Sequence, residues 1–151
     1  MTSAESRPID RPLLWVALGV FLIAFLRTAW ISDDAYITFR TSYTHPLWLM
    51  VLMPFHWAAG EAYFSTLVVS ITLSLLTIRA LTRIASSGDS ALVVLVVLLF
   101  SRAFIDYSTS GLENPLTGLL LVLFLGHALR TRPSMGRLGL LGGLLLLTRL
   151  D

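Results

Sequence analysis

The sequence contains no cysteine and no lysine, and only 13% of its 151 residues are charged. Without cysteine the chain forms no disulfide, no thiolate metal site and no thiol nucleophile. An ordinary soluble domain carries about a quarter charged residues, so this chain has too little polar surface to cover a water-soluble globule. The 11 basic residues, all arginine, exceed the 9 acidic ones by only two and are scattered, which argues against a nucleic-acid partner.

Hydrophobic residues make up 56% of the chain and gather in runs on the scale of a lipid bilayer. About 20 mostly apolar helical residues cross the hydrocarbon core, and shorter runs suffice where their ends snorkel. A cleaved signal peptide is the rival interpretation of the first run, but no small-x-small cleavage site follows it. The sequence therefore predicts an all-α, polytopic membrane protein with about five transmembrane helices, at about 13–30, 62–82, 90–105, 115–130 and 138–151.

The apolar stretch 46–59 is short and contains Pro54, so we expect it to lie in the membrane plane on the outer face. With the N-terminus in the cytoplasm, seven of the eleven arginines then lie on the cytoplasmic side, as the positive-inside rule requires. The same arrangement gathers six carboxylates on the outer side: Asp33, Asp34, Glu61, Asp106, Glu113 and Asp151.

Small polar residues recur at intervals of three or four within the second run and predict a packing seam along one helix face. They are Thr66, Ser70, Ser74 and Thr77. His56 and His127 stand alone on apolar helices, where packing is a better interpretation than metal ligation. The sequence has no metal-ligand spacing, no HExxH and no Walker loop. The fifth run ends at Asp151 after few uncharged residues, so we expect these residues to be the front of a longer protein.

Two adjacent carboxylates, Asp33 and Asp34, directly follow the first apolar run. A structural interpretation is available, because Ser32 can cap a helix whose first turn favours negative charge. The functional interpretation is that neighbouring carboxylates near a low-dielectric medium raise each other's pKa, which tunes a general base toward neutral pH. Residue chemistry alone leaves these two interpretations open.

Two further segments carry candidate groups. In the loop 106–115, Asn114 followed by Pro115 is a good helix start, and Ser110 with Glu113 could form a capping box if the helix begins earlier. The functional alternative is that Glu113 or Asn114 binds a sugar hydroxyl. The segment 147–151 contains Arg149 and Asp151; the guanidinium can bind phosphate in a bidentate manner, pair with the aspartate or snorkel.

Four strings carry a resemblance to a known family: Asp33-Asp34-Ala35-Tyr36-Ile37-Thr38-Phe39-Arg40, Tyr43-Thr44-His45-Pro46-Leu47-Trp48, Ser110-Gly111-Leu112-Glu113-Asn114-Pro115 and Thr148-Arg149-Leu150-Asp151. In order and membrane placement they resemble the GT-C superfamily of integral-membrane glycosyltransferases. The arabinofuranosyltransferases of the cell wall, whose relatives include flagellar motor control proteins, are the most similar group. Residues 1–151 would form the N-terminal part of such a transmembrane domain.

The resemblance implies sugar transfer from a polyprenyl-phosphate donor to a glycan acceptor at the outer face of the bacterial inner membrane. Asp33 or Asp34 would be the catalytic base. Substrate-binding residues would be Arg40, Tyr43, His45, Glu113, Asn114, Arg149 and Asp151. The resemblance implies no cofactor and no metal, although some superfamily members use a divalent ion near the acidic pair.

The chain departs from its relatives in one place: they have an extended loop where only Thr41 and Ser42 separate Arg40 from Tyr43 here. This short link leaves a second hypothesis open, a non-catalytic membrane scaffold, a motor-associated component or an inactive fragment of such an enzyme. A transporter fragment is a third hypothesis, since intramembrane charges such as Arg27 and Arg102 can line pathways. It is the weaker one, because no paired acid lies in the middle of a span.

Overall fold

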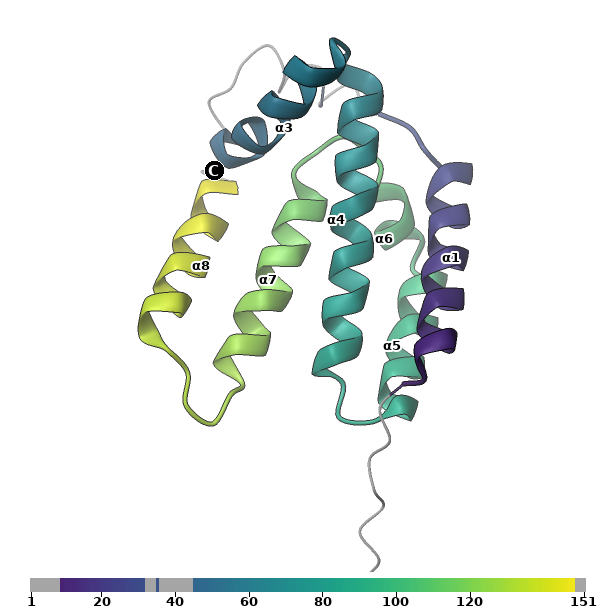
Figure 1. Ribbon diagram of the computed structural model, residues 1–151, viewed down its shortest axis with the longest axis vertical. Coiled ribbons are helices and arrows are strands. Elements are labelled where there is room, and N and C mark those ends of the chain that lie inside the picture. Colours follow the sequence, from purple (N-terminus) through teal and green to yellow (C-terminus); the bar gives the residue numbers. More distant parts are fainter. Residues whose placement is uncertain (1–8, 32–34, 36–44, 149–151) are drawn as a thin grey trace, which may run out of the picture.

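The computed structural model describes residues 9–31, 35 and 45–148. In this part of the chain the fold is all-α, with seven helices and no strand (Figure 1). The helices are α1 (Arg11–Arg27), α3 (Pro46–Ala59), α4 (Ala62–Ile84), α5 (Gly88–Phe100), α6 (Arg102–Tyr107), α7 (Asn114–Ala128) and α8 (Met135–Thr148). The predicted all-α class is confirmed for these residues.

Helix α4 is the central element of the bundle. It packs against α1, α3, α5 and α7, and α8 is added on the far side of α7. Figure 1 shows α1, α4, α5, α7 and α8 running roughly alongside one another, while α3 lies across one end of the bundle. The sequence interpretation of 46–59 as a separate short helix is correct, including both of its ends.

Helix boundaries follow from local capping. The Glu61 carboxylate accepts hydrogen bonds from the backbone N–H groups of Tyr63 and Phe64, which begins α4. Ser87 caps α5 in the same way through Ser90 N–H. Proline occupies the first turn of α1, α3 and α7, where its missing N–H costs no helical hydrogen bond.

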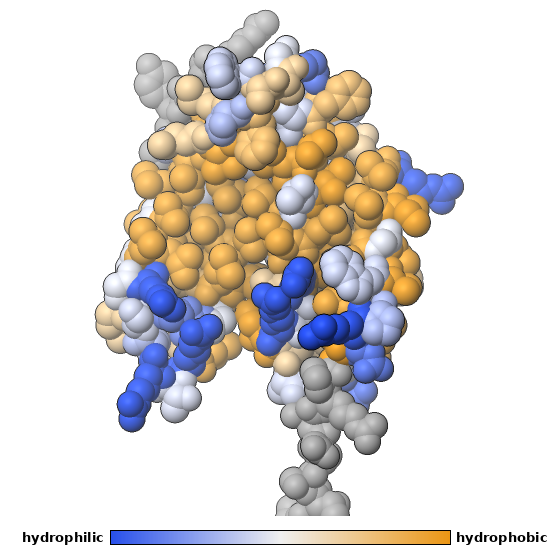
Figure 2. Space-filling model, viewed as in Figure 1, coloured by the Kyte–Doolittle hydropathy of each residue, from blue (hydrophilic) through white to orange (hydrophobic). Residues whose placement is uncertain are grey.

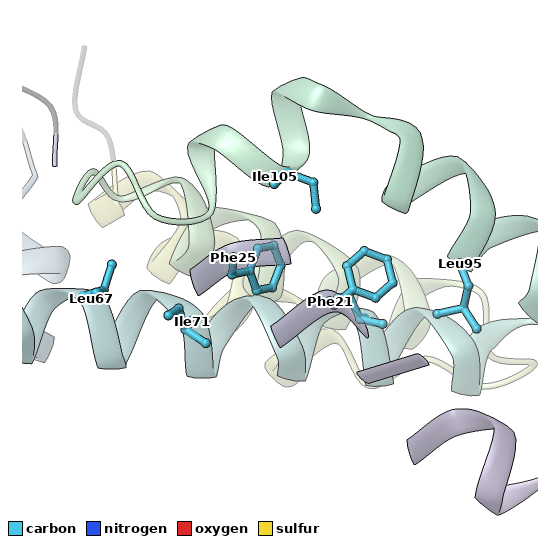
Figure 3. Packing of buried hydrophobic residues seen from close by; sticks show 7 residues of the cluster. Phe21, Phe25, Leu67, Ile71, Leu95 and Ile105 are labelled. Atoms are coloured by element: carbon cyan, nitrogen blue, oxygen red, sulfur yellow. The ribbon is translucent and has the colours of Figure 1, made fainter. Parts of the chain in front are cut away.

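Aromatic residues of α1 form the centre of one hydrophobic cluster. Phe21 and Phe25 are fully buried between Leu67 and Ile71 of α4 on one side and helices α5 and α6 on the other (Figure 3). Phe104 of α6 meets the Phe21 ring edge-on at a centroid distance of 6.3 Å. A second cluster joins α3, α4 and α7 around Trp48 and Leu52.

The polar stripe on α4 is buried inside the chain, as predicted for a packing seam. Thr66, Ser70, Ser74 and Thr77 are all buried. Thr77 donates to the carbonyl oxygen of Leu73, but the hydroxyls of the other three have no hydrogen-bond partner among the described residues. Small side chains suit close helix packing, and a Cβ atom at Gly118 of α7 would lie 4.0 Å from Thr77 Cγ2; the cost is three unsatisfied hydroxyl groups.

The expected helix at 90–105 is not continuous. Helix α5 ends at Phe100, Ser101 is extended, and α6 begins at Arg102. The Ser101 hydroxyl accepts from Phe104 N–H, so it caps a new helix rather than continuing the old one. Hydrophobicity alone did not reveal this break. The other expected spans correspond to α1, α4, α7 and α8 with ends shifted by a few residues.

Within the described residues, α4 is the one helix both long and apolar enough to cross a membrane. Helices α3, α5, α7 and α8 are apolar but shorter. Figure 2 shows an apolar band across the middle of the molecule, with strongly hydrophilic residues gathered at one end. Many large apolar side chains are exposed, among them Trp15, Ile23, Val97, Phe100 and Leu146.

Six arginines lie at one end of the bundle, which we call the basic end. It is formed by the start of α1, the end of α4, the start of α5, the end of α7 and the start of α8 (Figure 1). The arginines are Arg11, Arg79, Arg83, Arg130, Arg132 and Arg137. Glu61, Asp106 and Glu113 belong to segments near the opposite end. The fold thus separates most of the described arginines from these three carboxylates.

Candidate functional site

Segments that are far apart in the sequence meet at the end of the bundle opposite the basic end. They are the residues after α1, the start of α3, the loop between α6 and α7, and the end of α8. We call their contacting residues the junction cluster: Ile31, Ala35, His45, Trp48, Gly111, Glu113 and Thr148. All four strings that carry the family resemblance contribute to it or adjoin it.

His45 connects two of these segments through its two ring nitrogens. Nδ1 lies 3.1 Å from the carbonyl oxygen of Thr148. That oxygen belongs to the last described residue of α8, so the contact joins α3 to α8. Because a carbonyl only accepts, Nδ1 carries the hydrogen in this contact. Nε2, the other ring nitrogen, lies 3.7 Å from Glu113 Oε2.

Glu113 is a buried carboxylate at the N-terminus of α7, where the helix dipole favours negative charge. Its side chain makes no capping hydrogen bond to α7 and faces His45 instead. Its Oε2 atom accepts no hydrogen bond within the described part of the chain. A buried carboxylate oxygen without a donor is suited to accept a hydrogen bond from a bound hydroxyl group.

Gly111 allows the loop between α6 and α7 to approach the segment that follows α1. Its φ of 83° lies in the left-handed region that favours glycine. A Cβ atom at this position would lie 3.0 Å from both Ala35 Cβ and Ile31 Cγ2. The carbonyl oxygen of Gly111 accepts a 3.0 Å hydrogen bond from Nε1 of the fully buried Trp48. Ile31 and Ala35 flank the acidic pair in the sequence.

The loop preceding Glu113 is held by its own hydroxyl groups. Ser108, Thr109 and Ser110 are buried. Ser108 and Ser110 donate back to the carbonyl oxygens of Phe104 and Tyr107 at 2.6 and 3.2 Å. The possible Ser110–Glu113 capping box does not form, because the Ser110 hydroxyl is used in this turn and α7 begins only at Asn114. The loop is therefore a fixed support for Glu113.

The structure separates Asn114 from its neighbour Glu113. Asn114 lines a cavity of about 110 Å³ together with Ser74, Thr77 and Tyr107, on α4 and α6. Glu113 does not line this cavity, so the two neighbouring residues face different surroundings. Six other expected site residues lie outside the described residues: Asp33, Asp34, Arg40, Tyr43, Arg149 and Asp151.

His56 and His127 make contacts within the chain, in agreement with the packing interpretation. His56 Nδ1 lies 3.2 Å from the hydroxyl of Ser65. His127 is buried, and its Nε2 accepts a 3.1 Å hydrogen bond from Ser134 N–H, which holds the loop between α7 and α8. In the part of the chain described, no group of three or more histidine and acidic residues is arranged to hold a metal ion.

Sequence reasoning did not select Trp48, Gly111 and Thr148 as site residues, although all three lie within the strings that carry the resemblance. A buried indole N–H requires a hydrogen-bond acceptor, so Trp48 could have been selected from the sequence as a residue that bonds to another segment. The roles of Gly111 and Thr148 depend on neighbours that only the fold brings close.

Comparison with known proteins gives no further assignment. No family model matches the sequence, and neither the curated proteins nor the solved structures yield a significant match.

Proposed function

We propose that this chain belongs to a membrane glycosyltransferase of the GT-C type, which moves a sugar from a polyprenyl-phosphate donor to a glycan acceptor of the cell envelope. The junction cluster is the observation that carries the proposal. It joins segments bearing the resemblance around a buried carboxylate and a histidine. Arabinofuranose is the sugar we propose, because the four strings are most similar to those of arabinofuranosyltransferases.

In the proposed reaction, Asp33 or Asp34 removes the proton of an acceptor hydroxyl. The hydroxyl oxygen forms a bond to the anomeric carbon of the sugar, and the bond from that carbon to the phosphate oxygen breaks. The lipid phosphate leaves with the bonding electrons, and Arg149 balances its charge. General-base assistance contributes about 10²- to 10⁴-fold, so positioning and charge stabilisation supply much of the remaining rate.

Glu113 and His45 are proposed to bind hydroxyl groups of a substrate sugar. The support is the Oε2 atom of Glu113, which is buried, has no donor among the described residues and faces an imidazole 3.7 Å away. Arg40, Tyr43 and Asp151 are proposed to complete the substrate site on the strength of the resemblance. Asn114 is retained in this set by its motif, although it lines a cavity beside α4 and α6.

We further propose a multi-pass protein of the bacterial inner membrane with a cytoplasmic N-terminus. In this arrangement α1, α4, the α5–α6 pair, α7 and α8 cross the bilayer, and α3 lies in its plane at the outer face. Two observations support it: the exposed apolar side chains of the bundle, and the arginines concentrated at one end. The basic end would then face the cytoplasm.

The experiment is a transfer assay with a radiolabelled polyprenyl-phosphate sugar and membranes containing the protein. Asp33→Asn and Asp34→Asn each remove one candidate base, and we expect at least one of them to lose a hundredfold or more in rate. Asp106→Asn is the matched control, since it removes one carboxylate whose ion pair among the described residues is with the exposed Arg102. Full activity in both aspartate variants would exclude the proposed base.

The short link between Arg40 and Tyr43 favours the second candidate function, a non-catalytic scaffold or an inactive fragment. This alternative predicts that the unmodified chain transfers no sugar from any polyprenyl-phosphate donor. It also predicts that Asp33→Asn leaves the cellular function intact, whereas the glycosyltransferase proposal predicts a loss.

A further inference from the structure

A groove lies between α4 and α7 near the basic end of the bundle. Its volume is about 830 Å³. Its walls are apolar and include Leu76 of α4, Leu119 and Leu123 of α7, and Leu141 of α8. Three arginines also line it: Arg79, Arg83 and Arg130. The groove therefore combines a hydrocarbon-like wall with a concentrated positive charge.

These three guanidinium groups have no ion-pair partner among the described residues. Arg79 and Arg83 are one helical turn apart on α4, which places both on one face. Arg130 follows the end of α7 and reaches the same groove. Arg79 is half-buried, whereas Arg83 and Arg130 are exposed. The buried His127 beside them accepts a hydrogen bond from Ser134 N–H at Nε2. An anion in this groove would meet three guanidinium groups with no competing carboxylate among the lining residues.

A second groove, of about 590 Å³, lies on the other side of the same two arginines. Arg79 and Arg83 line it together with Arg11 and an apolar wall that includes Trp15 and Leu18 of α1. The α4 arginines thus line both grooves, of which the one between α4 and α7 is the more apolar. Proteins that bind anionic lipid headgroups use basic pockets between helices in this way.

We infer that the groove between α4 and α7 binds an anionic phospholipid. The phosphate contacts Arg79, Arg83 and Arg130, because guanidinium groups bind phosphate oxygens in a bidentate manner. An acyl chain lies along the leucine wall of the groove, which excludes it from water. Charge complementarity selects a lipid with net negative charge over a zwitterionic one. The inference rests on the proposed membrane location but not on sugar transfer.

The test measures lipid binding by the purified chain in detergent, with mixed micelles containing phosphatidylglycerol or phosphatidylcholine. We expect tighter binding of phosphatidylglycerol. Arg79→Gln, Arg83→Gln and Arg130→Gln should each weaken it about fivefold, and the triple variant on the order of a hundredfold. Inorganic phosphate and glycerol phosphate, which lack acyl chains, should compete poorly. Circular dichroism reports whether each variant keeps the helical content of the parent.

Arg137→Gln is the matched control, because Arg137 lies at the basic end but does not line the groove. Its binding should equal that of the parent. An equal loss in Arg137→Gln and the groove variants would overturn the inference in favour of general surface charge. Equal affinity for the two lipids, or full displacement by inorganic phosphate, would also overturn it. Sugar transfer is measured separately, so failure of the lipid site and failure of the glycosyltransferase proposal are distinguishable.

Discussion

The imidazole of His45 lies between the end of α8 and the start of α7, with Nε2 3.7 Å from Glu113 Oε2. Its other nitrogen, Nδ1, is fixed by the carbonyl oxygen of Thr148 at 3.1 Å. The same residue therefore contacts α8 through one ring nitrogen and directs the other toward a buried carboxylate. This arrangement sets the direction of Glu113 at the candidate site.

Replacing His45 by alanine removes the group that faces Glu113 and leaves a buried carboxylate without a partner among the described residues. We expect His45→Ala to lower the free energy of unfolding by about 1–3 kcal/mol. The measurement is thermal unfolding in detergent. Arg102→Ala is the control: it breaks the exposed pair with Asp106, whose contribution is about 0–1 kcal/mol. Equal losses in the two variants would contradict a stabilising role for His45.

Gly111→Ala tests the close approach of the loop to Ala35. A left-handed backbone costs an alanine about 1–2 kcal/mol, and the new Cβ would lie 3.0 Å from two side chains. Overpacking adds about 1–3 kcal/mol. Gly60→Ala is the matched control, because Gly60 is also left-handed at φ 65° but has nothing within 4 Å of a Cβ. Gly111→Ala should therefore be the more destabilising in thermal unfolding and should also reduce sugar transfer.

Trp48 is expected to contribute through both its ring and its indole N–H. Trp48→Phe keeps an aromatic ring but leaves the Gly111 carbonyl without its donor, at a cost of about 1 kcal/mol. Trp48→Ala also leaves a cavity and should cost about 3–5 kcal/mol. The two losses are compared by thermal unfolding. A Phe variant as unstable as the Ala variant would show that the hydrogen bond, rather than packing, dominates.

Removing an unsatisfied hydroxyl group from α4 is expected not to destabilise the protein. Ser70→Ala and Ser74→Ala each remove a buried hydroxyl that has no partner among the described residues, so the free energy of unfolding should stay unchanged or rise by up to about 1 kcal/mol. Ser65→Ala is the contrast, because that hydroxyl donates to Glu61 O at 2.6 Å and its loss should destabilise. A destabilised Ser70→Ala would indicate a partner for this hydroxyl in solution.

The buried stripe also affects the scaffold hypothesis. Thr66, Ser70 and Ser74 are at most 1% exposed, so they cannot contact a partner protein in this fold. Ser70→Ala should therefore leave co-purification with any associated protein unchanged. Association that depends on these residues would require the packing of α4 to open.

Local signals predicted much of the fold. The run 46–59 was recognised as a separate helix from its short apolar length and its internal Pro54, and the structure gives the same bounds. The start of α4 was predicted from the apolar run alone, and the structure adds that the Glu61 side chain caps it. The break at Ser101 escaped prediction, because the apolar run continues through it and only the hydroxyl's bond to Phe104 N–H marks the new helix.

The sequence by itself determined the helical class, the apolar runs and the arginines near particular helix ends, because these depend on residues close to one another along the chain. Only the tertiary structure decided that His45 meets Glu113 and Thr148, and that Gly111 meets Ala35. It also decided that Asn114 turns toward α4 and α6 instead. Such contacts depend on how helices pack across the bundle, and a periodic hydrophobic pattern specifies a buried face without specifying which residue lies opposite it.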